Sequence, residues 1–120
     1  MLPRNRRLTK HKEFALVAQN GRLLRSRLLM LRMCGNGMVE SRFGLTVSKK
    51  VGNAVIRNRI KRRLRDILRH TDIVQGWDIV ISSRKEAVAS DYAGLAIVLR
   101  GLLAQAGVLS VPEARTVVQQ

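Results

Sequence analysis

The 120-residue sequence contains a single cysteine, Cys34, and no group of Cys and His residues at metal-ligand spacing. One cysteine cannot form an internal disulfide, so we expect neither a disulfide framework nor a structural zinc site. A free cysteine beside a short apolar run is typically a small buried side chain. These features favour a reducing, cytoplasmic setting.

Long apolar runs are also absent. No stretch approaches the roughly 20 apolar residues that span a bilayer. The basic start of the chain, residues 1–7, is not followed by the apolar segment of a secretory signal. We therefore expect a protein without a membrane partner.

Acidic residues are scarce, since 8 Asp and Glu stand against 23 Lys and Arg, and the formal net charge is +15. The acids are scattered singly, and His11 and His70 have no carboxylate nearby in sequence, so no catalytic constellation and no protein-borne metal site is predicted. So high a charge on a small domain is tolerable when a polyanion neutralises it. The apolar share of 46% is that of a folded domain. Together these features favour nucleic-acid binding.

The length fits one domain, so residues 1–120 are predicted to form a single RNA-binding unit. Periodicity predicts an α+β fold with a small sheet. The expected order is a mobile basic arm (1–9), a helix (10–19), a hairpin across 28–48 that turns at residues 35–37, a helix (54–70), a strand (77–81), a helix (91–106) and a frayed tail (108–120).

The predicted helix over 54–70 is strongly basic on one side. Its apolar positions from Ile56 to Leu68 form one stripe that suits a core. Nine of the 23 basic residues fall between Lys49 and Arg69, and only Asp66 opposes them. Like charges four residues apart destabilise an isolated helix, whereas the planar fork of Arg matches phosphate oxygens. We therefore interpret this face as a phosphate-binding surface rather than an ordinary solvated one.

This segment resembles a known family. Residues 48–62, with Arg57-Asn58-Arg59 at their centre, closely resemble the signature of the bacterial ribonuclease P protein. The resemblance covers about residues 4–105. Further matches flank the signature: Arg7-Leu8, Lys12-Glu13-Phe14, Gly21-Arg22, Phe43-Gly44-Leu45-Thr46-Val47-Ser48, Asp78-Ile79-Val80-Ile81 and Arg84.

The resemblance implies both a fold and a function. The fold is similar to the second domain of ribosomal protein S5, in which the basic helix joins two parallel strands by a left-handed crossover, against the usual preference. The function is that of the small protein subunit of ribonuclease P, a protein monomer that binds the catalytic RNA and the 5′ leader of precursor tRNA. In this family the RNA cleaves the leader with Mg²⁺, and the protein carries no catalytic residue.

By position, the resemblance also assigns site residues. The leader is expected in a cleft between the first helix and the sheet, at Phe14 and Ser48. Several family members carry two more aromatic residues there, which are Ala18 and Arg32 here, so Arg32 is expected to contact the leader through charge instead of stacking. Phe14 is equally well explained as a core residue, and Asn58 as a structural one. Arg57 and Arg62 are also expected to border this cleft. Contact with the catalytic RNA is assigned to Lys49, Lys50, Arg57, Asn58, Arg59, Lys61, Arg62 and Arg65.

Two alternatives share the charge and size of this chain. A ribosomal or ribosome-associated RNA-binding protein fits equally well, and only the motif separates it from the first hypothesis. A DNA-binding regulator would place the basic helix in the major groove. However, a second close helix joined by a tight turn is missing around residues 54–70.

Overall fold

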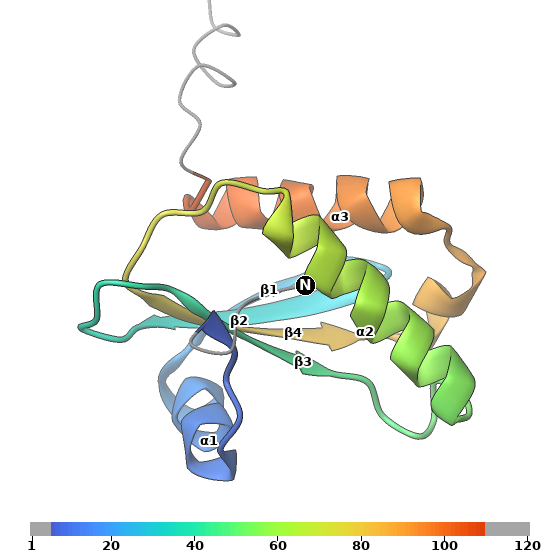
Figure 1. Ribbon diagram of the computed structural model, residues 1–120, viewed down its shortest axis with the longest axis horizontal. Helices are drawn as coiled ribbons and strands as arrows, with labels where there is room; N and C mark the ends of the chain where they lie inside the picture. The colour runs from blue at the N-terminus through green and yellow to red at the C-terminus, as the bar shows by residue number, and fades with distance from the viewer. Residues whose placement is uncertain (1–5, 110–120) are drawn as a thin grey trace, which may run out of the picture.

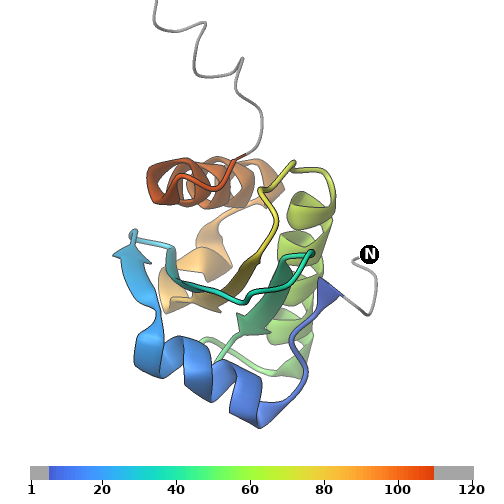
Figure 2. The same cartoon turned by 90° about the vertical axis from the view of Figure 1, so that its left-hand side faces the viewer.

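The computed structural model describes residues 6–109, in which four strands form one sheet between helices. α2 and α3 cover one face of the sheet and α1 covers the other (Figures 1 and 2). The predicted α+β class and element order are confirmed. The elements are α1 (His11–Asn20), β1 (Arg22–Arg25), β2 (Leu29–Gly35), β3 (Arg42–Thr46), α2 (Ala54–Arg69), β4 (Trp77–Ser83), a 3₁₀ helix (Lys85–Ala89) and α3 (Tyr92–Ala106).

The strands lie in the order β1-β2-β4-β3, so the predicted hairpin across 28–48 is wrong. β4 lies between β2 and β3, antiparallel to the first and parallel to the second. Alternation identifies a strand but not its partner. The burial of Ile79, Val80 and Ile81 on both faces suits a central strand covered by helices. The hairpin is instead β1–β2, and β1 was missed because two of its four residues are arginines.

The connection from β3 to β4 runs through α2. The chain leaves β3 at one end of the sheet and runs back through α2, which lies across one face of the sheet. It then enters β4, which lies next to β3 and runs parallel to it (Figures 1 and 2). This path is the left-handed crossover that the resemblance implies, and it is rare among parallel strand connections. It places the whole of α2 along the β3 side of the sheet.

The predicted basic helix and its apolar stripe are confirmed. The Asn53 side chain accepts a hydrogen bond from the Ile56 backbone N–H at 3.0 Å and caps the N-terminus of α2. Ile60, Leu64 and Ile67 are at most 1% exposed and lie in the main core. Because this stripe faces the sheet, the opposite side of α2 is displayed to solvent.

Both ends of the described chain form contacts with the rest of the fold. The backbone N–H of Leu8 donates to the Phe43 carbonyl at 2.8 Å, and Leu8 is 5% exposed, so residues 6–8 lie along the open edge of β3. Val108 is buried, and its carbonyl accepts from Val74 at 2.7 Å. Residues 6–8 and 108–109 are therefore placed against the sheet and α3, and the mobility of the arm and of the tail stays a prediction. Residues 1–5 and 110–120 lie outside the described residues.

α1 is fastened to the sheet by an ionic cluster. The Arg42 guanidinium donates to both carboxylate oxygens of Asp78 at 3.0 and 2.8 Å and to Glu13 of α1 at 2.7 Å. The Asp78 side chain is 9% exposed. Beside this cluster Val17 and Leu8 pack against Val80 in a second, smaller core. Charge and apolar burial together fix α1 on its face of the sheet.

We expect the ionic cluster to make stability depend on pH. The backbone N–H groups of Lys10 and Thr9, with Arg42, hold the pKa of Glu13 below its ordinary value of 4.5. A lowered folded pKa contributes stability that is present above the unfolded value and is lost as pH falls through the folded value. Thermal unfolding of the wild type and of Glu13→Gln should therefore differ most at neutral pH, and the difference should shrink as the pH falls below 4.5. A difference that stays constant from pH 7 to 3 would contradict this assignment.

Candidate nucleic-acid interface

The predicted RNA-binding residues lie along the solvent side of α2 and in the turn before it. Lys49 and Lys50 are exposed in that turn, at the end of β3. Arg57, Lys61 and Arg65 form one half-buried row, and the remaining three side chains, those of Asn58, Arg59 and Arg62, are exposed. The helical geometry thus brings six of the eight residues onto one element.

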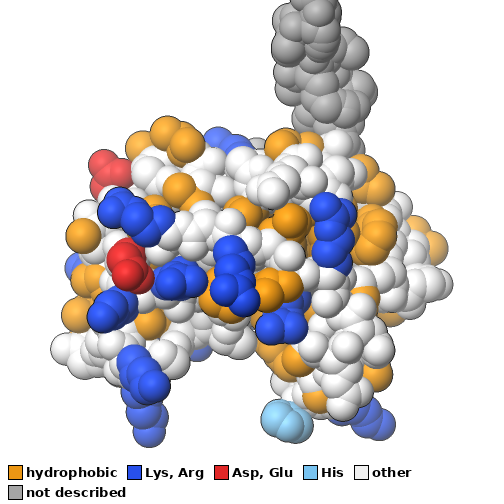
Figure 3. All heavy atoms as spheres, turned by 180° about the vertical axis from the view of Figure 1, so that it is seen from behind, with side chains coloured by type: hydrophobic (Ala, Val, Ile, Leu, Met, Phe, Trp, Pro, Cys, Tyr) orange, Lys and Arg blue, Asp and Glu red, His pale blue; other side chains and the backbone are white. Residues whose placement is uncertain are grey.

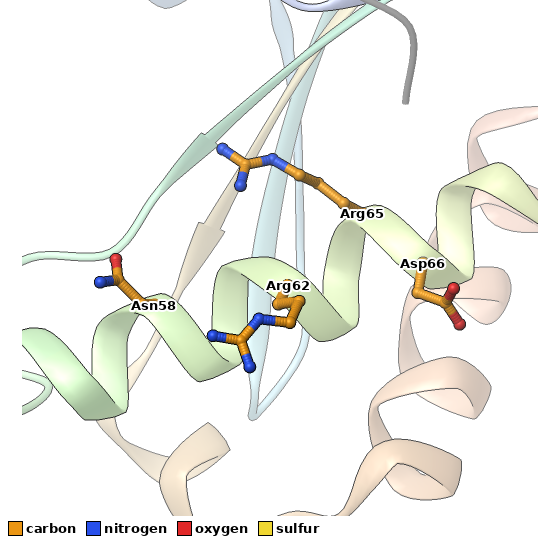
Figure 4. A pocket seen from close by; sticks show the side chains of 4 residues that line it. All are labelled: Asn58, Arg62, Arg65 and Asp66. Carbon is orange, nitrogen blue, oxygen red and sulfur yellow. The ribbon is translucent and has the colours of Figure 1, made fainter. Parts of the chain in front are cut away.

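Asn58, Arg62 and Arg65 line a hollow of about 430 Å³ together with Asp66. In Figure 4 the two guanidinium groups point toward the N-terminal side of the helix, and the Asp66 carboxylate points the other way, toward α3. The Tyr92 hydroxyl of α3 donates to this carboxylate at 2.6 Å and lowers its pKa. The single acid of α2 is therefore engaged by Tyr92 and forms no ion pair with Arg62 or Arg65.

None of the eight predicted side chains forms an ion pair or hydrogen bond within residues 6–109. The four ion pairs of this part of the chain involve Arg42, His70 and Arg84 instead. In addition, the buried Nε of Arg57 has no hydrogen-bond acceptor among the described residues. Buried donors are nearly always paired. The face is therefore cationic without any internal compensation.

Other basic residues hold the fold together, which their sequence did not reveal. Arg63 of α2 donates to the Ser90 carbonyl at 3.2 Å and ties the helix to the segment before α3. Arg42 ties two strands to α1, as described above. In the sequence, Arg63 and Arg42 look like the cations that have no partner. Only the fold, which places Ser90 beside Arg63 and Asp78 beside Arg42, distinguishes these structural arginines from the others.

Phe14 lies in the second core, and its ring sits directly on the backbone of β3. A Cβ atom on Gly44 would lie 2.4 Å from the ring, so only glycine permits this contact. The half-buried ring also lines a hollow of about 110 Å³ between α1, β3 and α2. Arg7 and Arg65 line the same hollow. Arg7 was not predicted as a site residue, although Arg7-Leu8 belongs to the segments that match the family.

Arg32 and Ser48 lie outside the hollow that Phe14 lines. The half-buried Arg32 guanidinium donates to the Ala18 carbonyl in the last turn of α1 at 3.2 Å. A cation at this end of a helix is favourable. Ala18 and Arg32, which stand where several family members carry aromatic residues, thus contact each other and help to hold α1 on the sheet. Ser48 is exposed in the turn after β3.

Two further features of residues 6–109 bear on chemistry. This part of the chain contains no group of three or more His, Cys, Asp or Glu side chains arranged to hold a metal ion. It also contains no helix with the length and apolarity needed to cross a membrane.

The fold and this surface define a small α+β domain that displays an uncompensated basic helix on a left-handed crossover. The profile of the family described as "Ribonuclease P" matches residues 2–107. The chain belongs to the family of ribonuclease P protein components. It is 42% identical over 110 residues to the ribonuclease P protein component of Dehalococcoides mccartyi strain CBDB1, with 92% of each chain covered.

Other relatives agree in sequence and in structure. The ribonuclease P protein component of Gluconacetobacter diazotrophicus is 41% identical over 112 residues, which cover 90% of this chain and 97% of that one. A crystal structure of the Staphylococcus aureus RNase P protein superposes with a TM-score of 0.80 at 30% identity, covering 88% and 98%. The protein from Thermotoga maritima gives 0.77 at 32% identity, covering 82% and 96%.

Proposed function

We propose that this chain is the RNA-binding protein subunit of ribonuclease P and that α2 contacts the catalytic RNA. The observation that supports this most directly is the face of α2, on which five predicted cations and Asn58 have no partner within the described residues. Such a face attracts a polyanion at long range. When its cations neutralise RNA phosphates, the counterions condensed on the RNA are released, which favours binding. The turn at Lys49 and Lys50 continues this surface beyond the helix.

The 5′ leader of precursor tRNA is the second RNA segment in this proposal. It would pass over the sheet face that carries α1, near Phe14, Arg32 and Ser48. The hollow at Phe14 supports this path because an aromatic edge and two guanidinium groups, of Arg7 and Arg65, line it together. A base can stack on an aromatic ring while cations contact its phosphate. This path also lies beside α2, so one protein could hold the two RNAs next to each other.

The division of labour is a further part of this proposal. The described part of the chain contains no group of three or more His, Cys, Asp or Glu side chains arranged to hold a metal ion, and the proposal includes no protein-bound metal. In this proposal Mg²⁺ and the hydrolysis of the phosphodiester bond belong to the RNA, which releases the leader and leaves the mature tRNA 5′ end. The protein, as a monomer in the cytoplasmic ribonucleoprotein, reduces the repulsion between two polyanions.

Reconstitution tests this function. We expect the protein to stimulate precursor-tRNA cleavage by bacterial ribonuclease P RNA at low Mg²⁺, and to stimulate it more for a substrate with a leader than for one whose leader is cut to a single nucleotide. The initial rate of 5′ leader release is the measurement. No stimulation at any protein concentration would refute the proposal. At equal salt, tighter binding to ribosomal RNA would favour a ribosome-associated protein, and tighter binding to duplex DNA would favour a DNA-binding regulator.

A further inference from the structure

A second group of cations surrounds the turn between β1 and β2 and the residues that follow β4, at one end of the sheet. We call it the turn cluster: Arg25, Arg27, Arg84 and Lys85. All four side chains are exposed. The order β1-β2-β4-β3 separates β1 from β3 by three strand spacings, or about 14 Å. Figure 3 shows the face on the β1 side, where Lys and Arg side chains are spread widely and acids are few.

The backbone beneath the turn cluster is fixed. The Ser26 backbone N–H donates a hydrogen bond to the Leu29 carbonyl at 2.8 Å, and the Ser26 hydroxyl accepts one from the Leu29 backbone N–H at 3.0 Å. The Arg84 N–H donates to the Leu28 carbonyl at 2.9 Å, which joins the start of the 3₁₀ helix to the turn. Leu28 and Leu29 are buried below. Cations on a fixed backbone lose less conformational freedom when they bind a ligand.

The charge of the turn cluster is also nearly uncompensated. Arg25, Arg27 and Lys85 have no ion pair or hydrogen bond from their side chains within residues 6–109, and Arg84 has only Glu86, at 4.0 Å. Charged side chains on an edge strand often prevent edge-to-edge pairing. That role accounts for Arg25 of β1 but not for the other three residues, which lie outside β1.

The surroundings of the turn cluster favour phosphates over a lipid surface. The exposed large hydrophobic side chains of the described residues lie on other elements, for example Val39 and Val74 in loops, Val55 on α2 and Ile97 on α3. A membrane-binding surface normally combines cations with such apolar side chains. Cations alone on a rigid turn suit the phosphodiester backbone of RNA.

We propose that the turn cluster is a second RNA-binding surface, so that this protein contacts phosphodiester backbone beside the β1–β2 turn as well as along α2. The inference rests on the proposed function for the nature of the partner and adds a surface distinct from α2 and from the cleft at Phe14. The backbone can belong to the catalytic RNA or to precursor tRNA, since both present the same phosphate chemistry.

The test is the salt dependence of binding by Arg25→Gln/Arg27→Gln. We measure its affinity for ribonuclease P RNA alone, and that of the assembled ribonucleoprotein for precursor tRNA, between 50 and 200 mM salt. Loss of two phosphate contacts should reduce the slope of log K against log salt by about 1.4 to 1.8. The matched control is Lys12→Gln/Arg100→Gln, which removes two exposed cations from α1 and α3 and should leave the slope unchanged. Arg25→Lys/Arg27→Lys should restore it.

Each outcome has a defined meaning. A reduced slope with the RNA alone assigns the surface to the catalytic RNA, and a reduced slope only with precursor tRNA assigns it to the substrate. Slopes equal to those of the control in both titrations overturn the inference. Arg62→Ala is titrated in parallel: if it alone reduces the slope, only the turn cluster is refuted, and if it also has no effect, the proposed function fails.

Discussion

Arg57→Ala/Arg62→Ala is expected to weaken binding to the catalytic RNA by about 100-fold or more, because each side chain contributes a charge-assisted contact worth roughly 1.5 to 3 kcal/mol. Both guanidinium groups lie on the solvent side of α2, and neither has an internal partner in the described chain. Each single variant should also reduce the salt slope of binding by about one unit. Equilibrium binding at several salt concentrations measures both quantities.

The fold should survive these substitutions, since neither side chain forms an ion pair or a hydrogen bond within the described residues. Lys12→Ala removes one exposed cation from α1 and serves as the charge-matched control for binding to the RNA alone. Arg63→Ala provides the opposite control, because it breaks the bond to Ser90 and should lower thermal stability more than RNA affinity. An unchanged slope for both Arg57→Ala and Arg62→Ala would mean that this face of α2 points away from the RNA.

The sequence was sufficient to predict α2 and its basic face because both depend on local periodicity. The stripe from Ile60 to Ile67 and the cap at Asn53 are separated by only a few residues, and a helix converts such spacings directly into faces. The free cations on that helix were therefore placed correctly. The sequence could not show which arginines are free, since Arg63 differs from its neighbours only through a partner 27 residues away.

Strand pairing was the part that the sequence could not predict. Residues 28–48 contain a short apolar run, an alternating segment and a Gly-rich turn between them, which together favour a hairpin. The observed sheet separates them with β4, which is more than 30 residues further along the chain. Non-local pairing of this kind is decided by burial on both faces of β4, where Ile79 and Ile81 face the main core and Val80 faces α1. The position of Arg42 beside Asp78 follows from that pairing alone.

Arg42→Met is expected to lower the free energy of unfolding by about 3 kcal/mol, because it removes one partner of a largely buried ion pair. Removing the guanidinium leaves the Asp78 carboxylate, 9% exposed, with only the Asn36 amide at 2.9 Å and without its charge partner. It also releases Glu13, so the amides of α1 should exchange with solvent faster than those of α2. Chemical denaturation and hydrogen exchange measure the two effects.

The double variant Arg42→Met/Asp78→Asn separates charge pairing from packing. Because the cost of Arg42→Met comes mainly from an unpaired buried carboxylate, neutralising that carboxylate should recover more than half of the lost stability. Failure to recover would assign the effect to packing of the Arg42 stem. Since Phe14 is carried by α1, the single variant should also reduce leader-dependent cleavage while leaving the salt slope for the catalytic RNA intact. A parallel loss of both would mean that α1 and α2 do not act on separate RNA segments.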